Sequence, residues 1–182
     1  MQTIRSGLTL LLLPLCLLAA SALAELSFEP SRSRIEFTGF KPGKSHSGGF
    51  RQFTATGNID WTDLSASKVR IEIDARSLWS DDGGLTTHLK SADFFHVAKY
   101  PAIVFETTNI EIRDPRNLVV SGALTLLDKT EEIVAPCKLE FSDKGLVVKT
   151  TLRIDRKRWG MTYGAHIEPE VEIAATLVFG RE

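Results

Sequence analysis

The feature that most constrains this sequence is an alternation of apolar and polar residues that returns in segment after segment. It is clearest at Val69, Ile71 and Ile73, which charged residues separate. Successive side chains of a strand point to opposite faces of a sheet, so this period of two predicts strands with one apolar face. The same pattern occurs over residues 26–28, 35–37, 118–126, 133–141, 146–154 and 171–179. A sheet with one apolar and one polar face is typical of antiparallel folds.

Residues that favour turns lie between these segments. They are Lys41-Pro42-Gly43, Gly48-Gly49, Asp114-Pro115-Arg116-Asn117, Asp143-Lys144-Gly145 and Ile167-Glu168-Pro169. Short connections join antiparallel neighbours, so we predict about eight antiparallel strands. They suit a closed eight-stranded barrel or a two-sheet sandwich, and we favour the barrel because closure removes exposed strand edges. Such a barrel holds side chains alone or one small apolar ligand, and the 10 phenylalanines together with glycines inside strand segments favour a cavity.

One segment, around residues 80–98, interrupts the strand pattern and predicts a short helical insertion. Ser91 is placed as an N-cap, and Phe94 and Phe95 follow it within the helical piece. Neighbouring helix residues point about 100° apart, so we expect one ring to pack in the interior and the other to cap a cavity. Pro101 favours extended backbone before it, and a strand is expected to begin with Ile103 and Phe105.

The first 24 residues predict a cleaved secretory signal peptide, which leaves residues 25–182 as a single domain. They carry one charge, Arg5, then an apolar run, and they end in Ala22-Leu23-Ala24, which has the form of a signal peptidase site. We therefore expect a secreted, periplasmic protein. The alternatives are an uncleaved membrane anchor, which the short run containing Pro14 disfavours, and a lipid anchor at Cys16, which the bulky Leu15 disfavours.

Charge and cysteine content exclude several classes of function. Loss of the signal removes one of the 22 basic residues and none of the 23 acidic ones, which changes the net charge from −1 to −2 and implies no nucleic acid partner. Cys137 would then be the only cysteine, so we predict neither a disulfide nor a cysteine metal site. The four histidines, His46, His88, His96 and His166, lack the spacing of metal ligands, so no metal site is predicted.

Several motifs together resemble the YceI-like family of periplasmic polyisoprenoid-binding proteins. They are Ser33-Arg34-Ile35-Glu36-Phe37, Gly49-Phe50, Gly57-Asn58-Ile59, the block from His88 to Phe95, Lys99-Tyr100-Pro101, Gly122-Ala123-Leu124-Thr125-Leu126, Arg158-Trp159-Gly160-Met161 and Glu170-Val171-Glu172-Ile173. The block from His88 to Pro101 is the specific one. The sequence departs from the family pattern at Leu85-Thr86 and at His96, where many members carry charged residues.

The resemblance implies a lipocalin-like barrel whose apolar tunnel binds an isoprenoid chain, such as a quinone tail or a similar amphiphile. It implies a carrier with no catalytic residues and no cofactor apart from the bound lipid. Seven residues have the phase to line the tunnel, although the same phase is also that of a filled core: Phe37, Phe53, Ile71, Ile73, Phe105, Leu124 and Leu126. The family motifs add His88, Leu89, Phe94, Phe95, Trp159 and Met161 to the candidate ligand-binding residues.

Polar residues near these motifs leave alternatives open. His88 and His46 are expected to anchor loops through hydrogen bonds to backbone, and Lys41 and Lys44 beside the glycines suit either a turn or a polar head group. The basic residues around Arg156 suit a solvated strand end or a transient membrane contact. Asp81-Asp82 reads as a helix cap. An enzyme with His88 or His46 as general base, an interaction module without ligand, and a homodimer are the remaining alternatives.

Overall fold

The structure, a computed structural model, describes residues 27–180 of the 182-residue chain, and the predicted signal peptide lies outside these residues. The described residues form one antiparallel sheet of eleven strands. The strands are β1 (Ser27–Phe28), β2 (Arg34–Lys41), β3 (Lys44–Phe50), β4 (Phe53–Asn58), β5 (Lys68–Asp74), β6 (Leu78–Ser80), β7 (Ala102–Asp114), β8 (Asn117–Leu126), β9 (Lys129–Ser142), β10 (Gly145–Asp155) and β11 (Glu170–Gly180). The all-β antiparallel prediction is confirmed.

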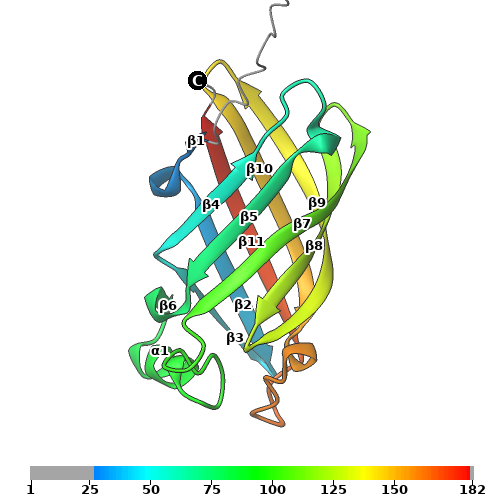
Figure 1. Ribbon diagram of the computed structural model, residues 1–182. Coiled ribbons are helices and arrows are strands. Elements are labelled where there is room, and N and C mark those ends of the chain that lie inside the picture. The colour runs from blue at the N-terminus through cyan, green and yellow to red at the C-terminus, as the bar shows by residue number, and fades with distance from the viewer. Residues whose placement is uncertain (1–26, 181–182) are drawn as a thin grey trace, which may run out of the picture.

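The sheet curls around its own apolar face into a barrel-like shape, with one short helix, α1 (Gly83–Lys90), at one end (Figure 1). The strand order is β4-β5-β7-β8-β9-β10-β11-β2-β3-β6, and β1 pairs with β11 beside this path. The short one-turn helices are η1 (Pro30–Arg32), η2 (Leu64–Ala66), η3 (Ala75–Ser77) and η4 (Arg156–Trp159). Residues 27–180 contain no helix with the length and hydropathy needed to cross a membrane.

The predicted count of eight strands is wrong, because β3, β4 and β6 were not expected: the sequence suggested a turn at Gly48-Gly49 and no strand over residues 53–58 or 78–80. A break at Arg51 and Gln52 separates β3 from β4, and η3 separates β5 from β6. The Ser77 hydroxyl accepts hydrogen bonds from the backbone N–H groups of Arg51 and Gln52, each at 3.1 Å, and donates one to the carbonyl of Asp74 at 2.6 Å. A single side chain therefore holds both breaks together.

Gly48 and Gly49 lie inside β3, so their assignment to a turn is wrong. A Cβ atom on Gly48 would lie 2.4 Å from the carbonyl oxygen of Trp79, and one on Gly49 would lie 2.7 Å from the carbonyl oxygen of Ile35. These positions need glycine because backbone from the flanking strands approaches closely. The predicted turn at Lys41-Pro42-Gly43 does connect β2 to β3, with Gly43 at a φ of 74°.

The helix is shorter than predicted and is capped by a different residue. The side chain of Asp82 accepts a hydrogen bond from the N–H of Leu85 at 2.7 Å and is the N-cap, which confirms the capping role of Asp81-Asp82. Ser91 is the C-cap, so its assignment as an N-cap is wrong. Phe94 and Phe95 lie in turns after the helix ends, so the helical angle between neighbours does not separate their rings.

Candidate functional site

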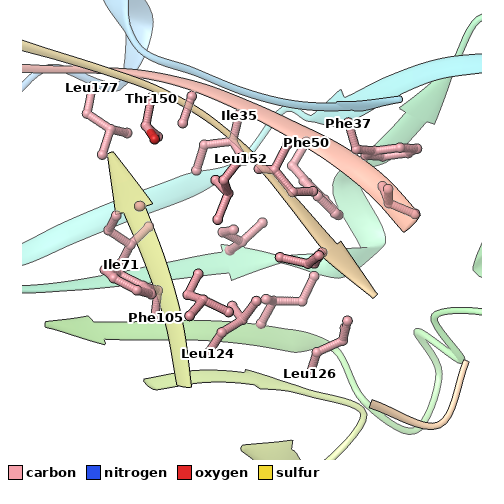
Figure 2. Close-up of a pocket in the computed structure, with 18 of the residues that line it drawn as sticks. Ile35, Phe37, Phe50, Ile71, Phe105, Leu124, Leu126, Thr150, Leu152 and Leu177 are labelled. Atoms are coloured by element: carbon pink, nitrogen blue, oxygen red, sulfur yellow. The ribbon is translucent and has the colours of Figure 1, made fainter. Parts of the chain in front are cut away.

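A cavity of about 510 Å³ lies inside the curled sheet, within the range of small-molecule sites. The inward-facing side chains of strands from β2 to β11 form its wall. Figure 2 shows Ile35, Phe37, Ile71, Phe105 and Leu124 pointing into it from several strands. Because β10 contributes every second residue from Leu146 to Ile154, the cavity extends roughly 26 Å along that strand at about 3.3 Å per residue.

The alternation of inward-facing residues identifies the cavity wall, and the solvent exposure of some of these residues shows that part of the interior is hollow. Phe105, Leu124, Leu152 and Ile173 point inward but remain half-exposed, so their surfaces face open space inside the sheet. Elsewhere, the inward-facing Leu139, Leu146 and Phe179 are buried. One part of the interior is thus tightly packed, and the rest is an apolar space.

The few polar groups in the wall have partners within the protein. The Thr150 hydroxyl donates to the carbonyl of Pro136 at 2.8 Å, and the Thr107 hydroxyl accepts from the N–H of Val69 at 3.0 Å. Ser67 accepts from the N–H of Asp60 at 2.9 Å. No buried side-chain nitrogen or oxygen within residues 27–180 lacks a hydrogen bond. The wall therefore offers a ligand a hydrocarbon surface.

Eleven of the thirteen predicted ligand-binding residues line this cavity. They are Phe37, Ile71, Ile73, His88, Leu89, Phe94, Phe95, Phe105, Leu124, Leu126 and Met161. Phe53 lies outside it, and its ring contacts that of Phe28 at a centroid distance of 6.0 Å. Trp159 is fully buried outside the cavity, and its Nε1 donates to the carbonyl of Leu124 at 2.9 Å. Those two residues support the fold around the cavity.

The cavity reaches the protein surface at the end that carries α1, which we call the mouth. Figure 1 shows α1, the turn between β2 and β3, and the segment after η4 gathered at this end of the sheet. Partly exposed residues that also line the cavity come from each of these parts: Lys41, His46, His88, Tyr163 and His166.

Two groups of aromatic rings lie at the mouth, one around each of the adjacent phenylalanines. Phe94, only 5% exposed, packs edge-on against His88 and Tyr163 with centroid distances of 5.0 and 5.3 Å. The half-buried Phe95 packs against Phe37 and Phe50 at 6.1 and 5.8 Å. Both rings line the cavity, Phe94 against the segment after η4 and Phe95 against β2 and β3.

Two histidines at the mouth are held by carboxylates. His46 Nδ1 lies 2.9 Å from Asp81 Oδ1, and His88 Nε2 lies 2.8 Å from Asp93 Oδ2. The expected hydrogen bonds to backbone are therefore wrong, because each histidine meets an acidic side chain. The hydrogen bond with His46, helped by the N–H of Ser47, holds the pKa of the Asp81 carboxyl below its usual value. Asp81 thus joins β3 to the segment that caps α1.

The sequence placed Arg156 in a basic run that suited a solvated strand end or a membrane contact, and the structure buries this residue instead. It is 3% exposed and lines the cavity, and its guanidinium donates to the carbonyls of Met161 at 2.6 Å, Glu168 at 3.1 Å, Ile167 at 3.2 Å and Gly164 at 3.5 Å. Burial lowers the pKa of Arg156, and the nearby Asp155 opposes that effect. Its neighbours Arg153, Lys157 and Arg158 made the run look solvated, and only the fold of residues 161–168 buries this member.

The described residues show no catalytic arrangement around either histidine. Neither His46 nor His88 hydrogen-bonds to a serine, threonine or cysteine side chain within residues 27–180. Cys137 lies in the cavity wall, and burial raises the pKa of its thiol, which disfavours the reactive thiolate. That part of the chain also lacks any group of three or more His, Cys, Asp or Glu residues able to hold a metal ion.

The model of the YceI-like domain matches residues 26–179. The chain belongs to the YceI-like family. It is 34% identical to Protein YceI of Escherichia coli O157:H7 over 92 residues, which are 50% of this chain and 48% of that protein. A UPF0312 protein of Vibrio cholerae serotype O1 is 34% identical over 87 residues, 48% of this chain and 46% of that protein. The chain therefore aligns with about half the length of these curated relatives.

Solved structures share the fold of this YceI-like chain over most of its length. BcnA of Burkholderia cenocepacia matches with a TM-score of 0.79 and 20% identity, over 84% of this chain and 99% of that one. A polyisoprenoid binding domain from Saccharophagus degradans, implicated in plant cell wall breakdown, matches with a TM-score of 0.69 and 15% identity, over 88% and 99%. At these identities the likeness concerns the fold.

Proposed function

We propose that this YceI-like protein is a periplasmic carrier that binds an isoprenoid or similar amphiphilic lipid in its cavity and catalyses no reaction. The observation that carries the proposal is the long apolar cavity whose few polar wall groups are already satisfied by the protein. The Saccharophagus degradans domain of similar fold is a polyisoprenoid binding domain, which supports the same class of ligand.

The energetics favour a chain-like hydrocarbon ligand. Burial stabilises by about 0.8 kcal/mol per methylene, so ~20 buried carbons contribute roughly 16 kcal/mol, against about 4–15 kcal/mol lost on association. A short apolar molecule would gain much less from the same wall. The length of the cavity along β10, from Leu146 to Ile154, therefore suits a long chain.

The periplasmic location is part of the proposal and rests on residues 1–24. Their apolar run and their Ala22-Leu23-Ala24 ending predict cleavage before Glu25, which leaves residues 25–182 as one domain. Intact mass spectrometry of the protein from a periplasmic fraction tests this directly. A mature chain that begins at Glu25 is expected, and a full-length chain retained in the membrane would contradict it. A transient membrane contact and a homodimer remain predictions.

The test of ligand binding is to purify the protein from periplasm without detergent, extract it with organic solvent and analyse the extract by mass spectrometry. We expect a long-chain lipid in stoichiometric amount. A protein that contains no bound lipid and also fails to bind added isoprenoids or quinones would overturn the carrier proposal. Turnover of a substrate that His88→Ala abolishes would favour an enzyme.

A matched pair of variants tests whether the lipid lies in this cavity. Gly39 lines the cavity, and a Cβ atom there would meet no atom within 4 Å, so Gly39→Trp places an indole in the open space. Thr151 is exposed and points to the opposite face of β10 from Thr150, so Thr151→Trp adds the same ring outside. We expect Gly39→Trp to lower the amount of extracted lipid and Thr151→Trp to leave it unchanged.

A further inference from the structure

The side chains that line the mouth carry hydrogen-bond donors and positive charge but no acidic group. Seven polar residues line the cavity there: Lys41, His46, Ser47, His88, Arg156, Tyr163 and His166. Among the described residues, no aspartate or glutamate lines the cavity at any point. Asp81 and Asp93, which hold His46 and His88, lie outside the lining. Negative charge is thus kept off the inner surface of the mouth.

A series of contacts connects Lys41, Arg156 and His88 along the opening. The carbonyl of Phe40, next to Lys41, accepts from the N–H of Glu168 at 2.9 Å, and the carbonyl of Glu168 accepts from Arg156. Arg156 also contacts the carbonyl of Gly164, whose neighbour Tyr163 packs against His88 with a centroid distance of 5.0 Å. Lys41, Arg156 and His88 therefore border the same opening.

Arg156 and Lys41 have no carboxylate partner. No acidic side chain within residues 27–180 forms an ion pair with either of them. Buried charges are usually paired, yet Arg156 is solvated only by four backbone carbonyls. The Asp155 side chain beside it accepts from the N–H of Lys157 and caps η4. The positive field of Arg156 acts across a cavity with an apolar wall, where electrostatic interactions are stronger than in bulk water.

We propose that the mouth selects lipids with an anionic head group, a phosphate or a carboxylate, which Lys41 contacts directly and Arg156 attracts. The proposal rests on the carrier function above and adds the chemistry of the ligand's polar end. The hydrocarbon chain of such a lipid lies along the apolar wall of the cavity. Its anionic head group supplies the negatively charged partner that Lys41 and Arg156 lack. Charge-assisted hydrogen bonds of this kind are the strong ones.

The test compares pairs of ligands that differ only in the head group, with the delipidated mature protein and isothermal titration calorimetry. Farnesyl phosphate is compared with farnesol, and palmitate with its methyl ester. The anionic member of a pair is expected to bind at least about tenfold more tightly, and added salt is expected to reduce the difference. Preference within the first pair alone assigns a phosphate head, and preference within both assigns anions in general.

Lys41→Met, with Lys44→Met as its control, tests whether Lys41 contacts the head group. The two lysines face each other across the β2–β3 hairpin, but only Lys41 lines the cavity. Lys41→Met is expected to reduce the preference for farnesyl phosphate over farnesol several-fold, and Lys44→Met is expected to retain that preference. Arg156 is left intact because its removal would take a hydrogen bond from each of four backbone carbonyls that hold residues 161–168 in place.

Two results would overturn the head-group proposal while the carrier function stands: equal affinities within both pairs, or a full preference in Lys41→Met. Failure of the carrier function looks different, because then neither member of either pair binds and no lipid is extracted from the native protein.

Discussion

The wall and the mouth of the cavity are built on opposite chemical principles. In the wall, polar groups such as Thr107 and Thr150 are turned to partners within the protein, so the ligand meets only hydrocarbon. At the mouth, the positively charged Lys41 and Arg156 and the histidines line the opening. The hydrophobic effect is non-directional, so the wall accepts apolar chains of many kinds. The proposed selection of lipids by their head group therefore rests on the mouth.

The largest effect is expected from Trp159, which lies in the packed region beside the cavity. Trp159→Ala removes a fully buried ring and leaves the carbonyl of Leu124 without its donor, so we expect a loss of about 3–5 kcal/mol in the free energy of unfolding. Urea denaturation measures it. Phe105→Ala, in the half-exposed wall, is the matched comparison and should cost clearly less. Equal costs would show that the wall is packed as tightly as its surroundings.

The adjacent phenylalanines separate stability from retention at the mouth. Phe94→Ala empties a buried site between His88 and Tyr163 and is expected to cost about 3 kcal/mol of stability. Phe95→Ala removes a half-buried ring and is expected to cost about half as much while releasing bound lipid faster. Thermal unfolding and lipid exchange are measured on both variants. If the loss of stability and the increase in lipid release had the same ratio in both variants, the two phenylalanines would not have separate roles.

Helix α1 provides a smaller test, because it lies at the mouth and lines the cavity only with Leu85, His88 and Leu89. Asp82→Ala removes the N-cap hydrogen bond to Leu85, which is expected to cost about 1 kcal/mol. Hydrogen exchange should increase in α1 and remain unchanged in β8 to β10. Asp82→Asn retains a capping side chain and is the control. Exchange that rises equally throughout the sheet would show that α1 and the wall unfold together.

The smallest effect on stability is expected at Tyr163, whose ring joins the segment after η4 to His88 and Phe94. Tyr163 is 45% exposed, so Tyr163→Ala should cost about 0.5–1.5 kcal/mol, the usual range of an aromatic pair. Because the ring bridges two segments of the mouth, lipid exchange should nevertheless become faster. Stopped-flow transfer of a fluorescent fatty acid to vesicles measures this. An unchanged rate of lipid exchange would mean that contacts with the cavity wall, and not with Tyr163, limit the release of lipid.

Sequence alone predicted what depends on local periodicity. The alternation along β5, β8, β9, β10 and β11 gave both the strands and the inward phase of the wall. It did not show β3, β4 and β6, because β6 has only three residues and Gly48, Gly49 and Gly57 interrupt the apolar pattern of β3 and β4. The link between β3 and β4 also depends on Ser77, which bonds Arg51 and Gln52 from a distant part of the chain.

The errors at the mouth have a different physical origin. Asp82 and Ser91 are both good N-cap residues, and only the position of α1 decides between them. Gly48 and Gly49 resemble a turn until Trp79 and Ile35 are placed beside them. Arg156 lies in a basic run, and its burial depends on the return of residues 161–168 over its side chain. Each of these features depends on tertiary contacts that have no local signal.

The position of β11 has a consequence for folding. Strands β7 to β11 follow one another as hairpins, but β11 also pairs with β2, where Val171 faces Gly39. This pairing closes a very long loop, and contacts of such high sequence separation form slowly. A chain that has not yet docked β11 exposes unpaired edges on both β2 and β10, which favour association with other chains. The pairing of β11 with β2 and β10 thus both completes the cavity wall and covers two strand edges.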